Sequence, residues 1–340
     1  MNATSIYAQL HREGLVADAQ PPAGSVDIPS PWYVRVMLGT AGWIAGLLLM
    51  GFFGGIFVAL FRDSTALIGL GLLQCGAAAF IYRMGKKNEV LDQVALGISM
   101  SGQAMVGFGL ARAMNYKMDA AIAIAVFQAV LVIVMSNYLH RLISTIFAGI
   151  AISVALWNNK AYGVASILMA VPLGVLWLRE SDWRATAYGE AISAVAWGLS
   201  IVVLFTPLPG HLGDFIRLSA MGIPEAAGFA VALVVFATFA CRDASPLARG
   251  VAFVGAVVLS ALAWRAPGVI ACGFLLLAGY RSGSKLLLGL AAVGLLSYLS
   301  AFYYQLSITL LAKSQSLAAM GAVMLVAGLV LHFMNRGKRP

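Results

Sequence analysis

The chain has 340 residues, of which 61% are hydrophobic and only 10% are charged, and its mean hydropathy is +0.90. A soluble domain carries about 45–50% apolar and about 25% charged residues, so these values exclude a soluble globular fold and also intrinsic disorder. The formal net charge is +9. Its basic residues come in ones, twos and threes between apolar runs, as at membrane faces, so we expect no nucleic-acid partner.

Residues 1–35 form a polar N-terminal tail without an apolar core of signal-peptide length. Two interpretations of this tail remain open. It is either a loose segment or a short amphipathic helix on the inner membrane face, which begins after Thr4 and places Ile6 and Leu10 on one side. In both cases a proline-rich linker follows.

Apolar runs follow almost without interruption from residue 36 to residue 334. They predict an all-α, polytopic membrane domain of about twelve transmembrane helices, followed by a basic cytoplasmic tail over residues 335–340. The predicted helices cover residues 36–61, 66–82, 94–111, 120–135, 142–157, 161–178, 191–206, 226–240, 250–264, 268–280, 286–306 and 317–334. Several runs are shorter than the roughly 20 residues of a perpendicular span, so we expect their helices to extend into neighbouring polar residues.

The distribution of Lys and Arg predicts the topology. With twelve spans and a cytoplasmic N-terminus, 15 of the 22 basic residues fall on the inner side and 7 on the outer side. If residues 250–280 are instead one long kinked helix, the split becomes 11 against 10 and Arg265 is left inside the membrane. Because cytoplasmic loops carry the excess of positive charge and a buried charge is costly, we favour twelve spans with both termini in the cytoplasm.

Motifs of known chemistry are missing from the sequence. It contains no phosphate-binding glycine loop, no zinc-protease motif and no nucleophile elbow, and its four histidines and three cysteines are widely scattered. All 13 acidic residues fall in tails, loops or the ends of predicted helices, whereas ion-coupled carriers usually place a carboxylate at mid-membrane. We therefore expect no enzyme activity, no catalytic residues, no metal and no cofactor.

Three consecutive predicted helices each carry one glutamine near the middle of the run, namely Gln74, Gln103 and Gln128. A glutamine that faces lipid leaves its amide unpaired at a considerable free-energy cost, so we expect these side chains to converge inside the bundle. Two interpretations remain. The amides either hydrogen-bond neighbouring helices as structural contacts, or line a polar pocket for a substrate.

A second candidate polar face lies at the end of the predicted helix 286–306. It consists of Ser297, Ser300, Tyr304 and Ser307, whose spacing places them on one side of a helix. This face is either a seam against another helix or the wall of a wetted cavity.

Three segments carry a resemblance to a known family. They are residues 91–96 (Leu-Asp-Gln-Val-Ala-Leu) with 101–104 (Ser-Gly-Gln-Ala), residues 137–141 (Asn-Tyr-Leu-His-Arg), and residues 303–307 (Tyr-Tyr-Gln-Leu-Ser) leading to 311–314 (Leu-Ala-Lys-Ser). From about residue 30 onward the sequence resembles the bacterial family called domain of unknown function 4401. This resemblance implies a multi-pass protein of the bacterial inner membrane, often encoded beside a smaller membrane protein with a Gly-Asp-Tyr motif. It implies no known activity and no known catalytic residue.

A rival resemblance concerns residues 83–87 (Arg-Met-Gly-Lys-Lys), which are similar to the end of a loop motif in major-facilitator carriers. That motif has a Gly and an Asp upstream, where this chain has Ala78 and Tyr82. A basic turn on the cytoplasmic face accounts for the segment without a carrier fold.

These observations leave three classes of function. The first is a transporter, channel or lipid- and solute-handling protein with a polar site between helices, which the many spans and internal polar residues favour. The second is a non-catalytic membrane scaffold or partner subunit, which the lack of intramembrane acids favours. An intramembrane enzyme is disfavoured, because no set of nucleophile, base and metal ligands lies at a common depth. The expected partners are the lipid bilayer and another small membrane protein.

Overall fold

The computed structural model describes residues 63–84, 89–206, 218–264 and 266–305, together with residues 11–13 and isolated positions within 37–48 and 311–325. The predicted amphipathic helix of the tail, the first and last predicted spans and the basic C-terminal tail lie outside the described residues, apart from those isolated positions.

The described residues form helices joined by short turns and linkers, and contain no β-strand. Its helices are α3 (Ser64–Arg83), α4 (Glu89–Ala113), α5 (Met118–Val134), α6 (Tyr138–Asn158), α7 (Tyr162–Leu178), α8 (Glu180–Arg184), α9 (Gly189–Phe205), α10 (Leu218–Ala240), α11 (Pro246–Leu262), α12 (Pro267–Ser282) and α13 (Lys285–Gln305).

The long helices lie where the apolar runs predict them, and only the short helix α8 is an addition. Within the described residues, the all-α prediction is therefore confirmed. Four helices begin four or more residues before their apolar runs: α4 at Glu89, α6 at Tyr138, α10 at Leu218 and α11 at Pro246. Backbone hydrogen bonding continues through polar residues, so hydropathy alone places the start of such a helix too late.

The early start of α10 moves one acidic residue into a helix. The sequence predicts an outer loop over residues 207–225, which would contain Glu225. In the structure Glu225 is the eighth of the 23 residues of α10, directly after Pro224, and its side chain is half-buried. The prediction that every acid lies in a tail, a loop or a helix end is wrong here, because the polar residues before the apolar run also adopt helical structure.

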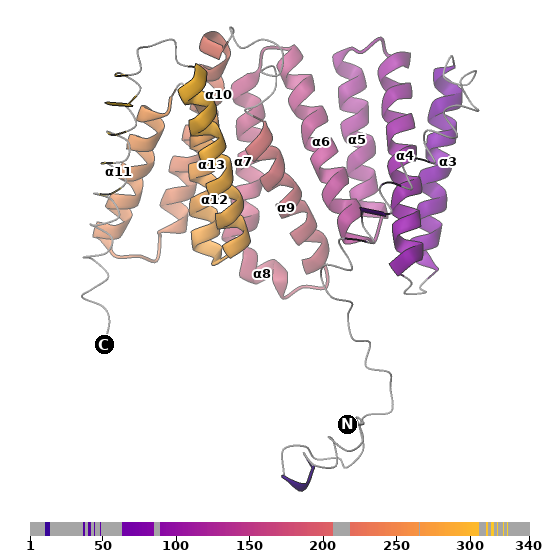
Figure 1. Cartoon of the computed structure of the whole chain (residues 1–340), viewed down its shortest axis with the longest axis horizontal. Helices are drawn as coiled ribbons and strands as arrows, with labels where there is room; N and C mark the ends of the chain where they lie inside the picture. The colour runs from indigo at the N-terminus through magenta and orange to yellow at the C-terminus, as the bar shows by residue number, and fades with distance from the viewer. Residues whose placement is uncertain are drawn as a thin grey trace.

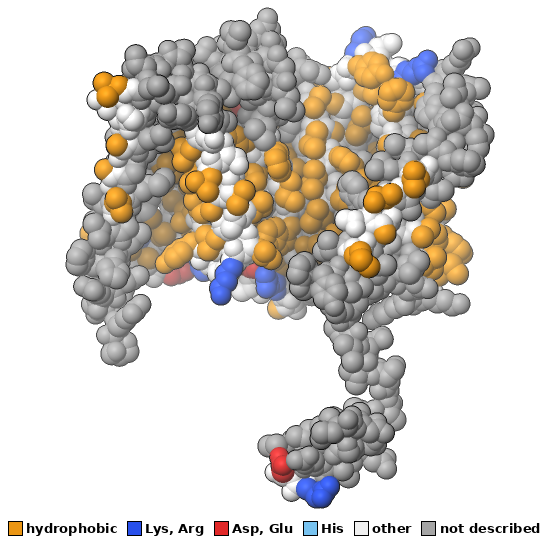
Figure 2. All heavy atoms as spheres, in the orientation of Figure 1, with side chains coloured by type: hydrophobic (Ala, Val, Ile, Leu, Met, Phe, Trp, Pro, Cys, Tyr) orange, Lys and Arg blue, Asp and Glu red, His pale blue; other side chains and the backbone are white. Residues whose placement is uncertain are grey.

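The composition of the helices is that of a membrane protein. Three segments are long and apolar enough to cross a membrane, Ser64–Arg83, Leu91–Ala113 and Tyr138–Leu156, and the other apolar helical segments of the described chain have 10–17 residues. On the face shown in Figure 2, hydrophobic side chains spread over the middle of the bundle while Lys and Arg lie at its upper and lower edges. Basic side chains at the two edges and apolar side chains between them match the polarity of a bilayer.

The break between α11 and α12 arises from the local sequence. Helix α11 ends at Leu262, and the backbone N–H of Ala266 then donates to the carbonyl of Ala263 in a turn. Pro267 takes the first helical position of α12, where its missing N–H costs nothing. Residues 250–280 therefore form two helices rather than one kinked helix.

The helices lie side by side in one bundle, with α3 and α4 at one end and α11 at the other (Figure 1). Backbone packing is closest within the pairs α3–α4, α5–α6, α7–α10 and α12–α13, and α6 packs on α9. The largest hydrophobic core includes the buried residues Trp177, Phe229, Phe236 and Phe274 of α7, α10 and α12. It therefore lies away from the α3–α6 end.

Two glycines allow α3 and α4 to approach each other closely. A Cβ atom at Gly71 would lie 2.6 Å from the carbonyl oxygen of Gly102, and a Cβ atom at Gly102 would lie 2.7 Å from the carbonyl oxygen of Gly71. The α3–α4 pair is thus in direct backbone contact, as small residues permit in membrane helices. The α3–α4 pair packs much less closely against the α5–α6 pair, and we call the region between the two pairs the sparse junction. The candidate site lies at this sparse junction.

Candidate functional site

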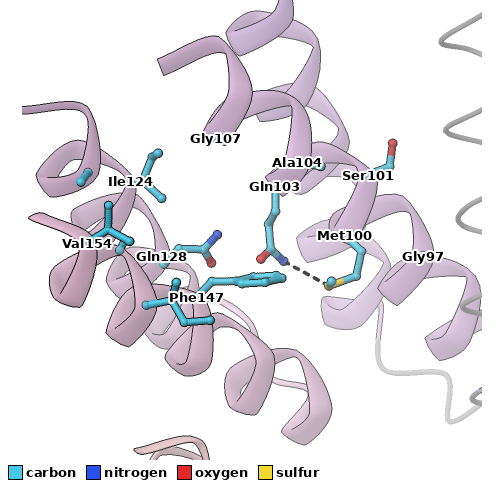
Figure 3. A pocket seen from close by; sticks show the side chains of 13 residues that line it. Gly97, Met100, Ser101, Gln103, Ala104, Gly107, Ile124, Gln128, Phe147 and Val154 are labelled. Atoms are coloured by element: carbon cyan, nitrogen blue, oxygen red, sulfur yellow. Dashed lines mark hydrogen bonds between the residues drawn. The ribbon is translucent and has the colours of Figure 1, made fainter. Parts of the chain in front are cut away.

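A cavity of about 430 Å³ lies between α4, α5 and α6 (Figure 3). This volume falls within the range of small-molecule pockets. None of the described residues that line it is charged. Ile150 and Val154 of its wall have exposed fractions of 46% and 41%, so the cavity reaches the apolar outer surface of the bundle on the α6 side. The main apolar lining residues are Met100, Ala104 and Gly107 of α4, Ile124 of α5, and Phe147, Ile150 and Val154 of α6.

Two of the three predicted glutamines line this cavity. Gln103 of α4 and Gln128 of α5 are each only 3% exposed, and Figure 3 shows both amide groups directed into the space beside the ring of Phe147. The side-chain oxygens of both residues are buried and have no hydrogen-bond partner. A buried carbonyl oxygen without a partner is costly, so these two oxygens mark where a ligand gains most by donating a hydrogen bond.

Gln74 lies on α3 and is not among the residues that line the cavity. It packs against Gly102, where α3 touches α4, and its side chain is half-buried. Its Oε1 is also unpaired, as are those of Gln103 and Gln128, so no hydrogen bond joins the three amides to one another. The structure thus brings Gln103 and Gln128 to one cavity and places Gln74 behind it.

A buried histidine lies beside the polar end of the cavity. His140 of α6 is 0% exposed, and its Nε2 lies 2.6 Å from Oγ of Ser99 and 3.0 Å from Nε2 of Gln103, both on α4. Its Nδ1 lies 3.3 Å from Oγ of Ser144, one turn further along α6. We call these four residues the His140 network. It connects α6 to α4 across the sparse junction between the two helix pairs.

The chemistry of the amide group determines the proton positions in this network. The Nε2 of Gln103 can only donate, so Nε2 of His140 must accept and the imidazole proton is assigned to Nδ1, which donates to Ser144. Met100 contributes a weak acceptor, since its Sδ lies 3.9 Å from the same amide nitrogen. With its nitrogen facing His140 and Met100, Gln103 presents its oxygen to the cavity.

Ser99 and His140, at 2.6 Å, also have the spacing of a catalytic nucleophile and its general base. Ser99 and His140 are both 0% exposed, however, and neither lines the cavity. A substrate in the cavity would therefore not reach the Ser99 hydroxyl. The Ser99 side chain instead extends the network towards α3, where its Oγ lies 3.9 Å from Sγ of Cys75.

Local contacts fix the start of α6, which carries His140. The backbone N–H of His140 donates to Oδ1 of Asn137 at 3.1 Å, as in a helix N-cap. Arg141 donates through Nε to the carbonyl of Val132 on α5 at 3.2 Å. Residues 137–141, which carry part of the family resemblance, therefore hold the imidazole in place against α4 and α5.

Sequence reasoning missed the His140 network. The predicted span begins at residue 142, which leaves His140 in the preceding loop as one of four scattered histidines. Two pairs with a spacing of four residues, Ser99 with Gln103 and His140 with Ser144, could have indicated polar faces on two nearby helices. No feature of the sequence indicates that these two faces meet.

The second predicted polar face does not form a cluster in the described part of α13. Ser297 and Ser300 are exposed, and Oγ of Ser297 donates to the carbonyl of Val293 in its own helix at 2.9 Å. The side chains of Tyr304 and Ser307 lie outside the described residues. The polar contact from α13 to another helix instead comes from Tyr298, whose hydroxyl donates to the carbonyl of Leu204 in α9 at 2.5 Å.

A metal-binding cluster is not found among the residues that the structure describes, since no three His, Cys, Asp or Glu side chains lie close enough together. The polar groups available to a ligand in the cavity are amides and the Ser101 hydroxyl. Such groups bind through hydrogen bonds and supply no charge.

Comparison with protein families matches residues 31–333 to a family described as a domain of unknown function (DUF4401). This range covers most of the chain and agrees with the resemblance drawn from its motifs. No curated protein and no solved structure matches the chain. The chain therefore belongs to the domain of unknown function family DUF4401.

Proposed function

We propose that this protein is a transporter or a lipid- or solute-handling protein that binds a small uncharged molecule in the cavity between α4, α5 and α6. It lies in the bacterial inner membrane, spans it twelve times and keeps both termini in the cytoplasm. The observation that carries the proposal is the pair of unpaired, buried oxygens of Gln103 and Gln128 on the wall of one cavity.

Two properties of the cavity support a ligand rather than a purely structural role for these amides. Polar groups in membrane helices normally pair with neighbouring helices, yet these oxygens have no protein partner. The wall at Ile150 and Val154 is open towards the lipid-facing side of the bundle, so an apolar molecule can enter from the bilayer.

Filling the cavity tests this function without disturbing its walls. A Cβ atom at Gly107 would meet no heavy atom within 4 Å, so Gly107→Phe places its ring in free space inside the cavity. The matched control is Gly76→Phe on α3, where a Cβ atom also meets nothing within 4 Å and the residue lies outside the cavity.

The wild type, Gly107→Phe and Gly76→Phe are each extracted with their surrounding membrane, and the co-purifying small molecules are quantified by mass spectrometry. We expect one molecular species to be enriched with the wild type and with Gly76→Phe and to be depleted from Gly107→Phe. Identical small-molecule profiles for all three proteins would contradict the proposal. A stoichiometric partner protein in place of a small molecule would favour the scaffold function instead.

A further inference from the structure

We propose that the cavity selects an uncharged amphiphile that donates a hydrogen bond, such as a long-chain alcohol, and that His140 sets this selectivity by fixing the orientation of the Gln103 amide. This inference rests on the proposed function and names the chemical class of its ligand.

The cavity offers hydrogen-bond acceptors at its polar end. The Oε1 atoms of Gln103 and Gln128 come from two different helices, are both buried and both lack a partner. A hydroxyl hydrogen placed between them satisfies at least one of these oxygens. A ligand group that is itself only an acceptor, such as an ether oxygen, leaves both unsatisfied.

The orientation of Gln103 is held by the protein. An amide side chain can in principle present either its oxygen or its nitrogen to a ligand. Here the nitrogen lies 3.0 Å from Nε2 of His140, which accepts, and 3.9 Å from Sδ of Met100. Turning the amide over would require the imidazole proton to move from Nδ1 to Nε2, and His140 would then no longer donate to Ser144. His140 is therefore a positioning residue for the acceptor.

The remaining walls exclude charged ligands and suit an aliphatic chain. None of the described lining residues carries a positive charge that would neutralise a carboxylate or a phosphate. An anionic oxygen beside two carbonyl oxygens in an apolar environment would be strongly repelled. Ile124, Phe147 and Ile150 provide apolar surface for a hydrocarbon body, and the lipid-facing opening lets that body extend into the bilayer.

A matched pair of photoreactive probes tests the proposal on the full-length protein in lipid nanodiscs. One probe is a ten-carbon alkanol with a diazirine on its chain, and the other is the methyl ether of the same molecule, which lacks only the donated hydrogen. The amount of probe bound at α4–α6 is measured by mass spectrometry of crosslinked peptides over a range of probe concentrations.

We expect the alcohol to reach half-saturation at an approximately fivefold lower concentration than the ether, the effect of about one net hydrogen bond. Gln103→Leu and Gln128→Leu should each bring the two concentrations closer together. Gln93→Leu is the control, because Gln93 also lies on α4 and has an unpaired Oε1 but does not line the cavity. It should keep the full preference.

The possible results separate this inference from the proposed function. If both probes reach half-saturation at the same concentration in the wild type and Gly107→Phe abolishes their labelling, the donor selectivity is overturned. Ligand binding in the cavity then still stands. Labelling of α4–α6 that Gly107→Phe does not reduce overturns both. The comparison of the two probes in the wild type requires no variant, so it remains decisive even if a glutamine variant does not fold.

The role of His140 has its own readout. In His140→Leu the amide nitrogen of Gln103 loses its acceptor and can turn towards the cavity, so the preference for alcohol over ether should fall while binding of the ether persists. A general loss of structure would weaken both probes equally. An unchanged preference in folded His140→Leu would show that the histidine does not position the acceptor.

Discussion

Replacing His140 with leucine should weaken the attachment of α6 to α4. The imidazole is fully buried and makes contacts of 2.6 Å and 3.0 Å to Ser99 and Gln103, both across the helix junction. Interhelical hydrogen bonds in membrane proteins contribute about 0.6 kcal/mol each on average and at most about 1.7. Leucine has a similar volume, so little packing is lost, and the two bonds predict a loss of about 1–3 kcal/mol in unfolding free energy.

The measurement is reversible unfolding of the purified protein in mixed detergent micelles, followed by a probe of tertiary structure. Ser153→Ala on the same helix is the control, since Oγ of Ser153 donates to the carbonyl of Gly149 within α6 at 2.8 Å and joins no other helix. Its unfolding free energy should stay within about 0.5 kcal/mol of the wild type, the usual range of changes away from special contacts.

A double-mutant cycle with Gln103→Leu isolates the contact itself. Because removing both partners leaves no unpaired group between them, the double variant should be more stable than the sum of the single changes by about 0.6 kcal/mol. A stability of His140→Leu equal to or above that of the wild type, together with strictly additive effects in the cycle, would refute the claim that this network joins α6 to α4.

Three further predictions concern topology and packing. A reporter fused after Pro340 should be active if it requires the cytoplasm and silent if it requires the periplasm, because the predicted twelve-span topology places 15 of the 22 basic residues on the inner side; the reverse result would exclude that topology. Ala266→Cys, in a background without the native cysteines, should react with an impermeant thiol reagent from outside, and protection there would indicate the opposite orientation. Gly71→Ala should destabilise the protein by roughly 1–3 kcal/mol, because its Cβ would lie 2.6 Å from the carbonyl oxygen of Gly102. Gly76→Ala, which meets no atom, should be neutral or slightly stabilising in the same unfolding assay, and equal effects of the two would argue against backbone contact between α3 and α4.

The sequence is sufficient to predict the long helices of the described chain, because a long apolar run has few alternatives to a helix in an apolar environment. It is less informative about where helices begin. His140 lies in the first turn of α6 and Glu225 in the third turn of α10, and both precede the predicted apolar runs 142–157 and 226–240. Polar residues at a helix start are compatible with helix and loop alike, and packing decides between them.

The candidate site was only partly predictable for a related reason. Central positions in consecutive runs give Gln74, Gln103 and Gln128 a common depth, but depth does not specify the direction of a side chain around its helix axis. That direction follows from helix packing, here from the contact of Gly71 with Gly102, which brings Gln74 against α4 and away from the cavity. The pairing of His140 with Gln103 likewise depends on contact between α6 and α4, which no local pattern encodes.

The most direct test of a ligand site in this protein is an experimental density map of the full chain in a lipid bilayer, at a resolution that shows side-chain amides. We predict elongated non-protein density between α4, α5 and α6, with one polar atom within hydrogen-bond distance of Oε1 of Gln103 or Gln128. A closed junction, in which the two amides hydrogen-bond directly to each other and no non-protein density lies between the helices, would contradict the account and leave these glutamines as structural contacts.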